Sequence, residues 1–316
     1  MRLAILGATS QIAKDLVLSF ATNFELELAL FARRPEAVYQ WLESVRLSNR
    51  YAAADFTAFT PYLRFDAIIN LVGVGNPVQT MALGADIFDV TLKYDDIALD
   101  YVRQHPDCRY IFLSSGAAYG ASFDEPVNGN TQAVIAINNL QPQDWYAVAK
   151  LHAECRHRSF PHLPIVDIRV FNYFSHTQDM EARFLITDIF RAIRDKTVLK
   201  TSADYIVRDF IHPSDFCKLV NSILGAPATN AVVDAYSKAP IDKPTLLIAM
   251  QEKFGLRYEV VQTGASVNAT GGKPHYYSLN RRGAEFGYLP TLTSLQGILK
   301  ESSQLLQFNV NETRST

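Results

Sequence analysis

The stretch RLAILGATSQIAKDLVLSF (residues 2–20) decides the fold of this chain. Its first part is a short apolar run closed by Gly7, which predicts a buried β-strand. Thr9 and Ser10 can cap the segment that follows, whose apolar residues recur at helical spacing. A strand, a glycine turn and a helix therefore open the chain.

Further apolar runs repeat this pattern along the first half of the sequence. Helical stretches separate them, including one over Trp145 to His157, and polar residues follow their C-terminal ends. Short continuous apolar strands alternating with helices predict a parallel sheet covered on both faces, a Rossmann-like doubly wound α/β fold. The predicted strands are Arg2–Gly7, Leu26–Ala32, Asp66–Val74, Tyr110–Leu113 and Ile165–Val170.

Beyond about residue 172 the alternation loosens. Residues 1–171 are predicted to form the sheet domain, to which residues 205–235 return with a strand-like Val207–His212 and a helix over Phe216–Leu224. Residues 172–204 and 236–316 are predicted to form a smaller α/β substrate-binding region at the C-terminal side. A cleft between the two would lie at the carboxyl ends of the parallel strands, where doubly wound proteins bind ligands.

Composition excludes several classes of protein. The chain has 316 residues, 48% of them hydrophobic and 20% charged, with a net charge of −2. This is the composition of a globular protein without the basic field that binds nucleic acid or anionic membranes. No segment is apolar enough to serve as a signal peptide or membrane span, so a cytoplasmic protein is expected. The three cysteines form no C-x-x-C pair and are expected to be buried free thiols: Cys108, Cys155 and Cys217.

The glycine turn predicts a dinucleotide site, with a plain tight turn as the alternative. Backbone N–H groups at a helix N-terminus attract phosphate, and small residues let the chain approach a pyrophosphate closely. Two of the usual three glycines are Ser10 and Ala13 here, so the prediction depends on the strand-turn-helix context. The residues expected to contact the cofactor in this turn are Gly7, Thr9, Ser10, Gln11 and Ile12.

The end of the second strand favours NADP over NAD. An NAD site usually has an acid here for the ribose 2′-hydroxyl, whereas Arg33 and Arg34 suit a 2′-phosphate. The alternative is two solvated surface arginines. Asp55 could accept a hydrogen bond from the adenine amino group or be a simple turn aspartate. Cofactor contacts are also expected at Leu71, Val72, Gly73 and Val170, which lie at the ends of later strands.

Tyr146 and Lys150 form the strongest catalytic signal. Four residues apart on a predicted helix, they share one face. Tyrosine is a poor base at neutral pH, but an adjacent ammonium and an oxidised nicotinamide would favour the phenolate. Ser115, after an earlier strand, can hydrogen-bond the substrate oxygen. The three are predicted to be catalytic, and Tyr146 and Lys150 also to contact the cofactor.

These motifs together resemble the extended short-chain dehydrogenase/reductases, the NAD(P)-dependent nucleotide-sugar epimerases, dehydratases and reductases. The resemblance covers nearly the whole chain, and residues 114–120 and 146–150 look like the family's S-S-x-x-x-Y-G and Y-x-x-x-K motifs. Residues 169–172 are similar to its R-x-F-N, which implies that Asn172 lies by the substrate diphosphate. Residues 208–215 are similar to its R-D-F-I-H-x-x-D, which implies that Arg208 grips a nucleotide phosphate.

The sequence also departs from the family pattern. Sugar 4,6-dehydratases carry an acidic pair just after the catalytic Ser/Thr, where Gly116 and Ala117 stand here, so dehydration is disfavoured. The gap between Ser115 and Tyr146 is longer than usual, which indicates a loop insertion around Asn128–Asn139.

The resulting hypothesis is an NADP(H)-dependent oxidoreductase that reduces a nucleotide-activated 4-keto-sugar. NAD is the alternative to NADP as its cofactor. The first alternative is a nucleotide-sugar epimerase with the same residues, because the fold does not determine the reaction. The alternative from another class is a non-catalytic dinucleotide-binding sensor or scaffold, which would be expected to lose the Tyr or the Lys. Resemblance further implies a homodimer formed through the helix at residues 145–157.

Other residues are given structural interpretations. His152, His157 and His162 lack the acidic partner of a ligand set, so no metal site is predicted and they are expected to be helix-surface histidines. The aromatic residues Tyr276-Tyr277 and Phe171 to Phe174 could stack on a base or sugar, but core packing is favoured. Lys273 is expected either to reach a phosphate or to be solvated.

Overall fold

A seven-stranded parallel sheet forms the larger part of the molecule. The computed structural model describes residues 1–74, 77–120, 123–262 and 273–312. The order of the strands is β11-β6-β5-β4-β1-β2-β3, and every neighbouring pair is parallel. Their bounds are β1 Arg2–Leu6, β2 Glu27–Phe31, β3 Ala52–Ala54, β4 Ala67–Asn70, β5 Arg109–Ser115, β6 Ile165–Val170 and β11 Ala231–Asp234.

Helices cover both faces of this sheet, because side chains of successive strand residues point to opposite sides. On β1, Leu3 and Ile5 pack with α1, α2 and α7, whereas Ala4 and Leu6 pack with α4 and α5. All four side chains are fully buried. The helices are α1 Gln11–Phe20, α2 Pro35–Ser44, α4 Asp86–Gln104, α5 Trp145–Arg158 and α7 Pro213–Gly225.

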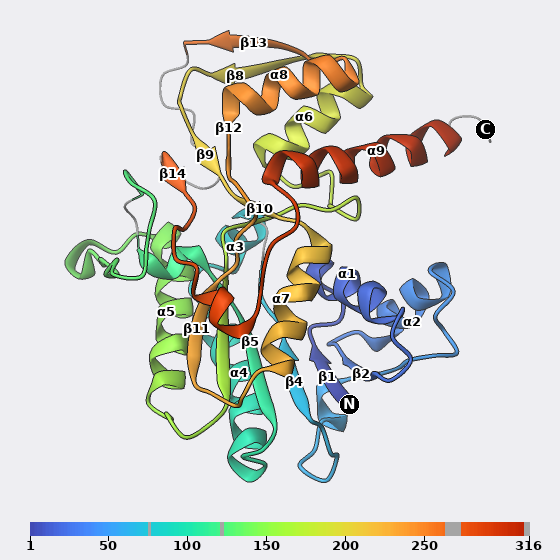
Figure 1. Ribbon diagram of the computed structural model, residues 1–316, viewed down its shortest axis with the longest axis vertical. Coiled ribbons are helices and arrows are strands. Elements are labelled where there is room, and N and C mark those ends of the chain that lie inside the picture. Colours follow the sequence, from blue (N-terminus) through green and yellow to red (C-terminus); the bar gives the residue numbers. More distant parts are fainter. Residues whose placement is uncertain (75–76, 121–122, 263–272, 313–316) are drawn as a thin grey trace.

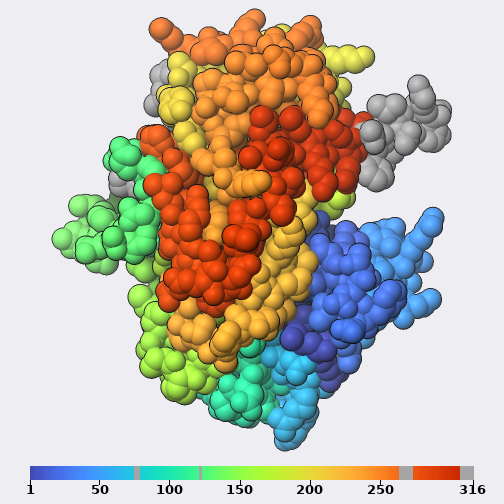
Figure 2. All heavy atoms as spheres, in the orientation of Figure 1, coloured from blue at the N-terminus to red at the C-terminus, as the bar shows by residue number. Residues whose placement is uncertain are grey.

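A smaller α/β region sits above the carboxyl ends of the strands (Figure 1). It has its own apolar core, in which Phe174 stacks on Phe190. After β11 the chain enters the smaller region, returns onto the larger one and ends in the smaller region, as the orange and red atoms show (Figure 2). The elements are β7 Asn172–Tyr173, α6 Leu185–Arg194, β8 Val198–Ser202, β9 Val207–Arg208, β10 Phe210–Ile211, β12 Ile241–Asp242, α8 Lys243–Phe254, β13 Arg257–Val261, β14 His275–Tyr276 and α9 Ser294–Glu312. Helix α3 (Pro77–Leu83) and five short 3-10 helices, Phe56–Ala58, Gly116–Tyr119, Ile137–Asn139, Pro142–Asp144 and Arg282–Phe286, complete the described elements.

The predicted doubly wound α/β fold is confirmed, with differences in detail. The expected single strand Val207–His212 is two short strands in different sheets. The reason lies between them at Asp209, whose buried carboxylate accepts hydrogen bonds from Ser237 and Ser294. A side chain tied to two other segments interrupts the ladder. The division into residues 1–171 with 205–235 and the remainder stays a prediction.

The cysteine prediction is wrong in one place. All three thiols are free, and Cys108 is buried, but Cys155 is exposed on α5 and Cys217 is half-buried. Cys155 lies on the side of α5 that turns away from the sheet. None of the helices in the described ranges is long and apolar enough to cross a membrane.

Candidate active site

Gly7 forms the turn between β1 and α1. Its φ of +82° lies in the left-handed region, which glycine adopts without strain. A Cβ at Gly7 would lie 2.8 Å from the backbone N of Val72 and 2.9 Å from the carbonyl O of Leu71. The turn after β1 therefore touches the end of β4, and only glycine fits there.

The first turn of α1 has unused hydrogen-bond donors. Ser10 is the N-cap, and its hydroxyl accepts a hydrogen bond from the N–H of Ala13 at 3.3 Å. Within the described residues, the N–H groups of Gln11 and Ile12 make no hydrogen bond. Such groups at a helix N-terminus bind phosphate oxygens. The residues fit the pyrophosphate of a dinucleotide, and Ser10 occupies a cap position without blocking these two donors.

Other predicted residues of the turn lie differently. Thr9 is exposed, and Ile12 packs partly against the core. The side chain of Gln11 turns toward the smaller region, where its amide donates to the hydroxyl of Ser175 at 2.8 Å. Gln11 therefore joins the cofactor turn to the loop after β7.

Replacing Gly7 with alanine is expected to raise the dissociation constant of the cofactor at least tenfold and to destabilise the fold. Alanine must adopt a left-handed conformation, at about 1 to 2 kcal/mol, and its Cβ must push β1 away from Val72. Titration of cofactor fluorescence and urea unfolding measure the two effects.

Gly255 supplies the control. It also has a positive φ, +72°, but a Cβ there would meet nothing within 4 Å. Gly255→Ala should lower the free energy of unfolding only by the cost of a left-handed alanine and leave cofactor affinity unchanged. Equal affinity for both variants would contradict the assignment of the Gly7 turn to the cofactor.

The ends of β2 and β3 place the predicted adenosine residues at one edge. Arg33 and Arg34 are exposed, and within the described residues neither side chain makes a hydrogen bond or ion pair. Ala54 pairs with Phe31 in the sheet, so Asp55 follows β3 beside the end of β2. Asp55 Oδ1 accepts from the N–H and hydroxyl of Thr57 at 2.8 and 2.5 Å, and these hydrogen bonds lower its pKa. Asp55 is thus the N-cap of the short 3-10 helix Phe56–Ala58.

The end of β4 approaches Lys150, and the end of β6 lies beside Ser115. Leu71 is buried, and the N–H of Val72 donates to Asn70 Oδ1 at 3.0 Å. A Cβ on Gly73 would lie 3.6 Å from Lys150 Nζ. Val170 ends β6 beside the end of β5. Leu71, Val72 and Gly73 therefore lie between the glycine turn and Lys150.

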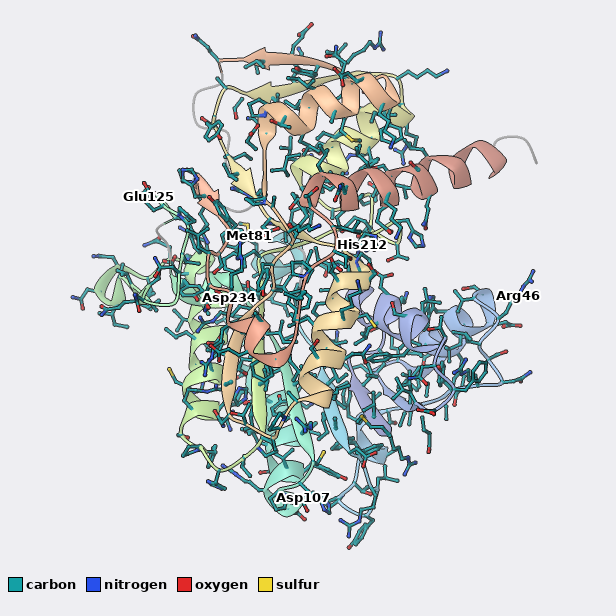
Figure 3. The ribbon with its side chains drawn as sticks, in the orientation of Figure 1. Arg46, Met81, Asp107, Glu125, His212 and Asp234 are labelled. Carbon is teal, nitrogen blue, oxygen red and sulfur yellow. The ribbon has the colours of Figure 1, made fainter. Side chains whose placement is uncertain are left out.

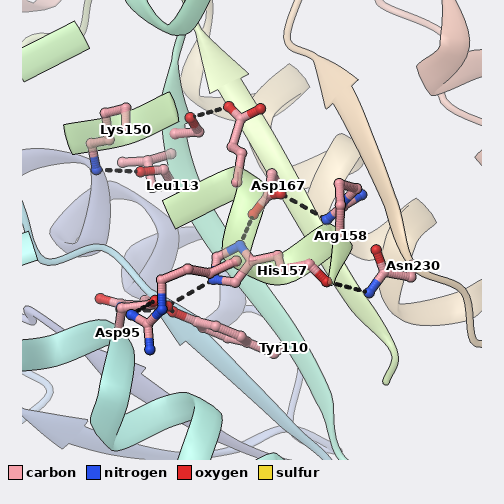
Figure 4. A network of polar contacts seen from close by, with 12 residues as sticks. Asp95, Tyr110, Leu113, Lys150, His157, Arg158, Asp167 and Asn230 are labelled. Atoms are coloured by element: carbon pink, nitrogen blue, oxygen red, sulfur yellow. Dashed lines mark hydrogen bonds and ion pairs between the residues drawn. The ribbon is translucent and has the colours of Figure 1, made fainter. Parts of the chain in front are cut away.

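The structure brings Ser115, Tyr146 and Lys150 together. Ser115 ends β5, is 6% exposed, and accepts a hydrogen bond from the N–H of Ala117 at 3.1 Å. Tyr146 lies in the first turn of α5 and hydrogen-bonds Ser115. Lys150, one turn later, is buried, and its ammonium donates to the carbonyl O of Leu113 at 2.8 Å (Figure 4).

A polar cluster under the site fixes α5 against β5. Ser114 donates to Glu154 Oε1 at 2.5 Å, and Arg169 holds both oxygens of Glu154. Glu154 lies one turn after Lys150 on the same helix face. The cluster sets the distance between the strand that carries Ser115 and the helix that carries Tyr146.

The acidity of Tyr146 differs from the expectation. Burial raises its pKa, and the hydrogen bond with Ser115 lowers it by less. The ammonium of Lys150 lies 5.9 Å from the Tyr146 ring and over the Phe112 ring, at 4.5 Å. Burial also lowers the pKa of Lys150 to about 8, against Asp95 and other acids that raise it. Tyr146 is therefore protonated at neutral pH.

The predicted substrate residues lie on the smaller region. Asn172 in β7 donates to the carbonyl O of Asp209 at 3.3 Å. Arg208 in β9 is 7% exposed, and its Nη1 donates to the carbonyl groups of Val207 and Lys273. Burial lowers the pKa of Arg208 to about 10. Arg208 is thus held rigidly by the backbone.

Tyr276 in β14 joins these predicted substrate residues to Ser115. Its ring lies 5.9 Å from the guanidinium of Arg208 and 5.0 Å from the ammonium of Lys273, and its hydroxyl is 3.4 Å from Ser115 Oγ. The carbonyl of Tyr276 faces the amide of Asn172 at 3.5 Å. Sequence reasoning assigned Tyr276 to the core, and it is indeed only 5% exposed. Nothing in the sequence indicated that its hydroxyl would lie beside Ser115.

His157 corrects the prediction of helix-surface histidines. His152 and His162 are exposed, but His157 is fully buried. Its nitrogens face Asp95 at 2.7 Å and Asp167 at 2.6 Å (Figure 4). It is buried because it lies on the α5 face toward β5 and β6. Among the described residues, no group of three or more His, Cys, Asp or Glu could hold a metal ion.

Comparisons with known proteins agree with this architecture. The model of the NAD dependent epimerase/dehydratase family matches residues 3–237. A search of curated proteins finds no match. Among solved structures, UDP-glucuronic acid 4-epimerase from Bacillus cereus, in complex with UDP-glucuronic acid and NAD, is 17% identical, with a TM-score of 0.78 over 98% of this chain and 100% of that one.

Two further structures have the same fold. The dTDP-glucose 4,6-dehydratase from Bacillus anthracis str. Ames, in complex with NAD, is 17% identical, with a TM-score of 0.76 over 98% of this chain and 97% of that one. The UDP-N-acetylglucosamine 4-epimerase from Methanobrevibacter ruminantium M1, in complex with UDP-N-acetylmuramic acid, is 15% identical, with a TM-score of 0.78 over 98% of both chains.

Proposed function

We propose that this chain, which belongs to the NAD dependent epimerase/dehydratase family and is an enzyme of the extended short-chain dehydrogenase/reductase type, is an NADP(H)-dependent reductase of a nucleotide-activated 4-keto-sugar. The observation that carries the proposal is the convergence of Ser115, Tyr146 and Lys150 beside the glycine turn. A phenol, a hydroxyl and an ammonium at one point suit proton transfer to a carbonyl oxygen.

The chemistry divides among these three residues. Tyr146 gives its proton to the carbonyl oxygen of the sugar as that carbon is reduced, and Ser115 orients the same oxygen by a hydrogen bond. Lys150 binds the nicotinamide ribose, and its charge favours the phenolate that Tyr146 becomes. A bound NADPH would supply the hydride.

A nucleotide sugar is supported by the second half of the site. Arg208 and Lys273 place two cations beside the Tyr276 ring, next to Asn172. Two partly desolvated cations near each other suit a diphosphate, which carries the opposite charge. Solved structures of this fold hold UDP-sugars, among them UDP-glucuronic acid in the Bacillus cereus epimerase.

Reduction is favoured over dehydration by the residue after Ser115. A Cβ at Gly116 would lie 2.4 Å from the Phe171 ring, so this position has no room for the acid that a 4,6-dehydratase carries there. Epimerisation needs no such acid and is the second candidate, because several solved structures of this fold are 4-epimerases.

The reaction is tested by titrating the protein with NADPH and NADH and then adding a panel of nucleotide 4-keto-sugars. Loss of absorbance at 340 nm with one sugar establishes a reductase and names its substrate. Sugar interconversion on chromatography without net cofactor oxidation establishes the epimerase instead. If neither cofactor binds, the reductase and the epimerase are both contradicted. The predicted dinucleotide-binding turn and the alternative of a dinucleotide sensor are then contradicted as well.

Preference for NADP is tested at the end of β2. Arg33→Ala and Arg34→Ala together are expected to raise the dissociation constant of NADPH roughly 10- to 100-fold, because charge-assisted hydrogen bonds to the 2′-phosphate are lost. Affinity for NADH should change little. Calorimetric titration measures both. Arg46, exposed beyond the far end of α2 (Figure 3), provides the control: Arg46→Ala should alter neither affinity. Equal affinity of the wild type for NADPH and NADH would overturn the assignment.

A further inference from the structure

Tyr276 brings a second phenol to the catalytic serine. It comes from β14 in the smaller region, 161 residues after Ser115, and its hydroxyl lies 3.4 Å from Ser115 Oγ. Tyr146 hydrogen-bonds the same serine from α5. Two tyrosine hydroxyls from different regions of the molecule therefore meet at one Oγ.

The Tyr276 ring is held firmly. It packs edge-on against Phe123 at 4.7 Å between ring centres and tilted against Phe171 at 5.3 Å. The main chain on both sides is also fixed, since the N–H of His275 donates to the carbonyl O of Phe123, and the N–H of Val127 donates to that of Tyr277. A hydroxyl on so rigid a support is aimed at a definite point.

Packing alone does not account for a hydroxyl at this place. Among the other members of this cluster, Phe123, Val127 and Phe171 are wholly apolar, and the Tyr119 hydroxyl donates to Asp234 instead. Within the described residues, the Tyr276 hydroxyl contacts the Ser115 side chain and the backbone of Ala117. A phenylalanine would fill the same volume without placing a polar group against the serine.

The distance between the two hydroxyl oxygens suits a shared ligand atom. Two hydroxyl oxygens 3.4 Å apart can each lie at about 2.8 Å from a third oxygen that sits beside the line joining them. Tyr146 reaches the same neighbourhood, so a carbonyl oxygen there would meet Ser115, Tyr146 and Tyr276 together.

We propose that Tyr276 is a further catalytic residue, which donates a hydrogen bond to the reacting oxygen of the substrate beside Ser115. The proposal rests on the proposed function and deepens it. Tyr276 stabilises the negative charge that develops on this oxygen, and its proton stays on the phenol, while Tyr146 delivers the proton that the oxygen finally takes up.

The two phenols are suited to different roles. Burial and the neighbouring Tyr146 raise the pKa of Tyr276 far above its usual range, so Tyr276 keeps its proton through the cycle. Tyr146 lies near the Lys150 ammonium, which supports its ionised form during turnover. A neutral donor and a titrating acid thus act on one atom.

The variant Tyr276→Phe tests the proposal. Removing one donor to a developing oxyanion is expected to lower kcat roughly a hundredfold, with a smaller change in KM. The pH dependence of kcat should keep a limb that belongs to Tyr146, at a shifted pH. Unchanged kcat would overturn the proposal.

Tyr119→Phe is the matched control. Tyr119 belongs to the same aromatic cluster, but its hydroxyl donates to Asp234 at 2.8 Å and does not contact Ser115. This variant also loses one buried hydroxyl, so it reports the structural cost of such a loss. Its kcat should stay within about twofold of the wild type. A comparable fall in both variants would assign the Tyr276 effect to packing and contradict the catalytic role.

A second measurement needs no substrate and separates this proposal from the proposed function. NMR of protein labelled with ¹³C at tyrosine Cζ follows each phenol, and Tyr146→Phe identifies the Tyr146 signal. In Tyr276→Phe, Ser115 loses one of its hydrogen-bond partners, so the pKa of Tyr146 should shift. An unchanged Tyr146 titration would overturn the coupling on which the proposal rests. Failure of every 4-keto-sugar in the wild type would instead contradict only the proposed function.

Discussion

Replacing Tyr146 with phenylalanine is expected to lower kcat at least a thousandfold, at the upper end of what general acid catalysis contributes. The ring remains, so α5 and its packing are kept, and only the hydroxyl that hydrogen-bonds Ser115 is lost. Cofactor affinity should change less than threefold, because the N–H groups at the glycine turn, which are expected to bind the pyrophosphate, are unchanged. Stopped-flow absorbance at 340 nm measures the hydride-transfer step directly.

A companion variant separates the two halves of the motif. Lys150→Met removes the ammonium that binds the carbonyl O of Leu113 and lies beside Gly73. It should weaken cofactor binding as well as turnover, unlike Tyr146→Phe. Full turnover of Tyr146→Phe would show that another group gives the proton and would contradict the assignment of Tyr146 as the acid.

The second large effect concerns stability and its pH dependence. His157 lies between the fully buried carboxylates of Asp95 and Asp167, each of which also binds an arginine. Replacing His157 with glutamine leaves two buried carboxylates with too little positive charge. The free energy of unfolding should fall by about 3 to 5 kcal/mol at pH 6. Urea unfolding measures this change.

The pH dependence of the stability follows from the direction in which the pKa of His157 is shifted. Burial alone would lower the pKa of His157, but Asp167 and Asp95 raise it from 6.5 to about 9. Charged His157 therefore contributes stability that is complete below pH 6.5 and is lost as the pH rises through 9, on the order of 3 kcal/mol. The stability difference between wild type and His157→Gln should shrink by that amount between pH 6 and pH 9.5.

Two comparisons isolate this effect. Lys150 contributes in the opposite direction, because its lowered pKa of about 8 makes the fold more stable as the pH rises above 8. Both proteins carry this contribution, so only the part of it that changes when Asp95 and Asp167 lose the His157 charge remains in their difference. His152→Gln, on the exposed side of the same helix, should change stability by less than about 0.5 kcal/mol. A difference that is constant with pH would mean that His157 is neutral in the fold.

Most of the sheet could be predicted because its strands are recognisable in the sequence as apolar runs. The five predicted strands are continuous apolar runs that end at glycine or polar residues, and each corresponds to a strand of the parallel sheet. β3 could not be found in this way, since its three alanines have neither bulk nor alternation. β11 is four residues long and is identified as a strand only by its pairing with β6.

The candidate site could be predicted where its residues are close in sequence. Tyr146 and Lys150 share a helix face, and Gly7 stands in a turn of known shape. Tyr276 could not be predicted, because its hydroxyl reaches Ser115 only after the smaller region folds back over the strand ends. The burial of His157 depends likewise on Asp95, 62 residues away on another helix. Contacts of this kind are decided by packing and leave no local pattern.

The position of β11 has a consequence for how the chain is made. β11 is the edge strand beside β6, yet part of the smaller region and the helix α7 are synthesised between the two. Until β11 leaves the ribosome, β6 presents a row of unpaired N–H and C=O groups, which another nascent chain could join. Pairing across such a separation is slow, because a long loop must close first. Chaperone demand during synthesis should therefore peak after β6 emerges and fall once β11 docks.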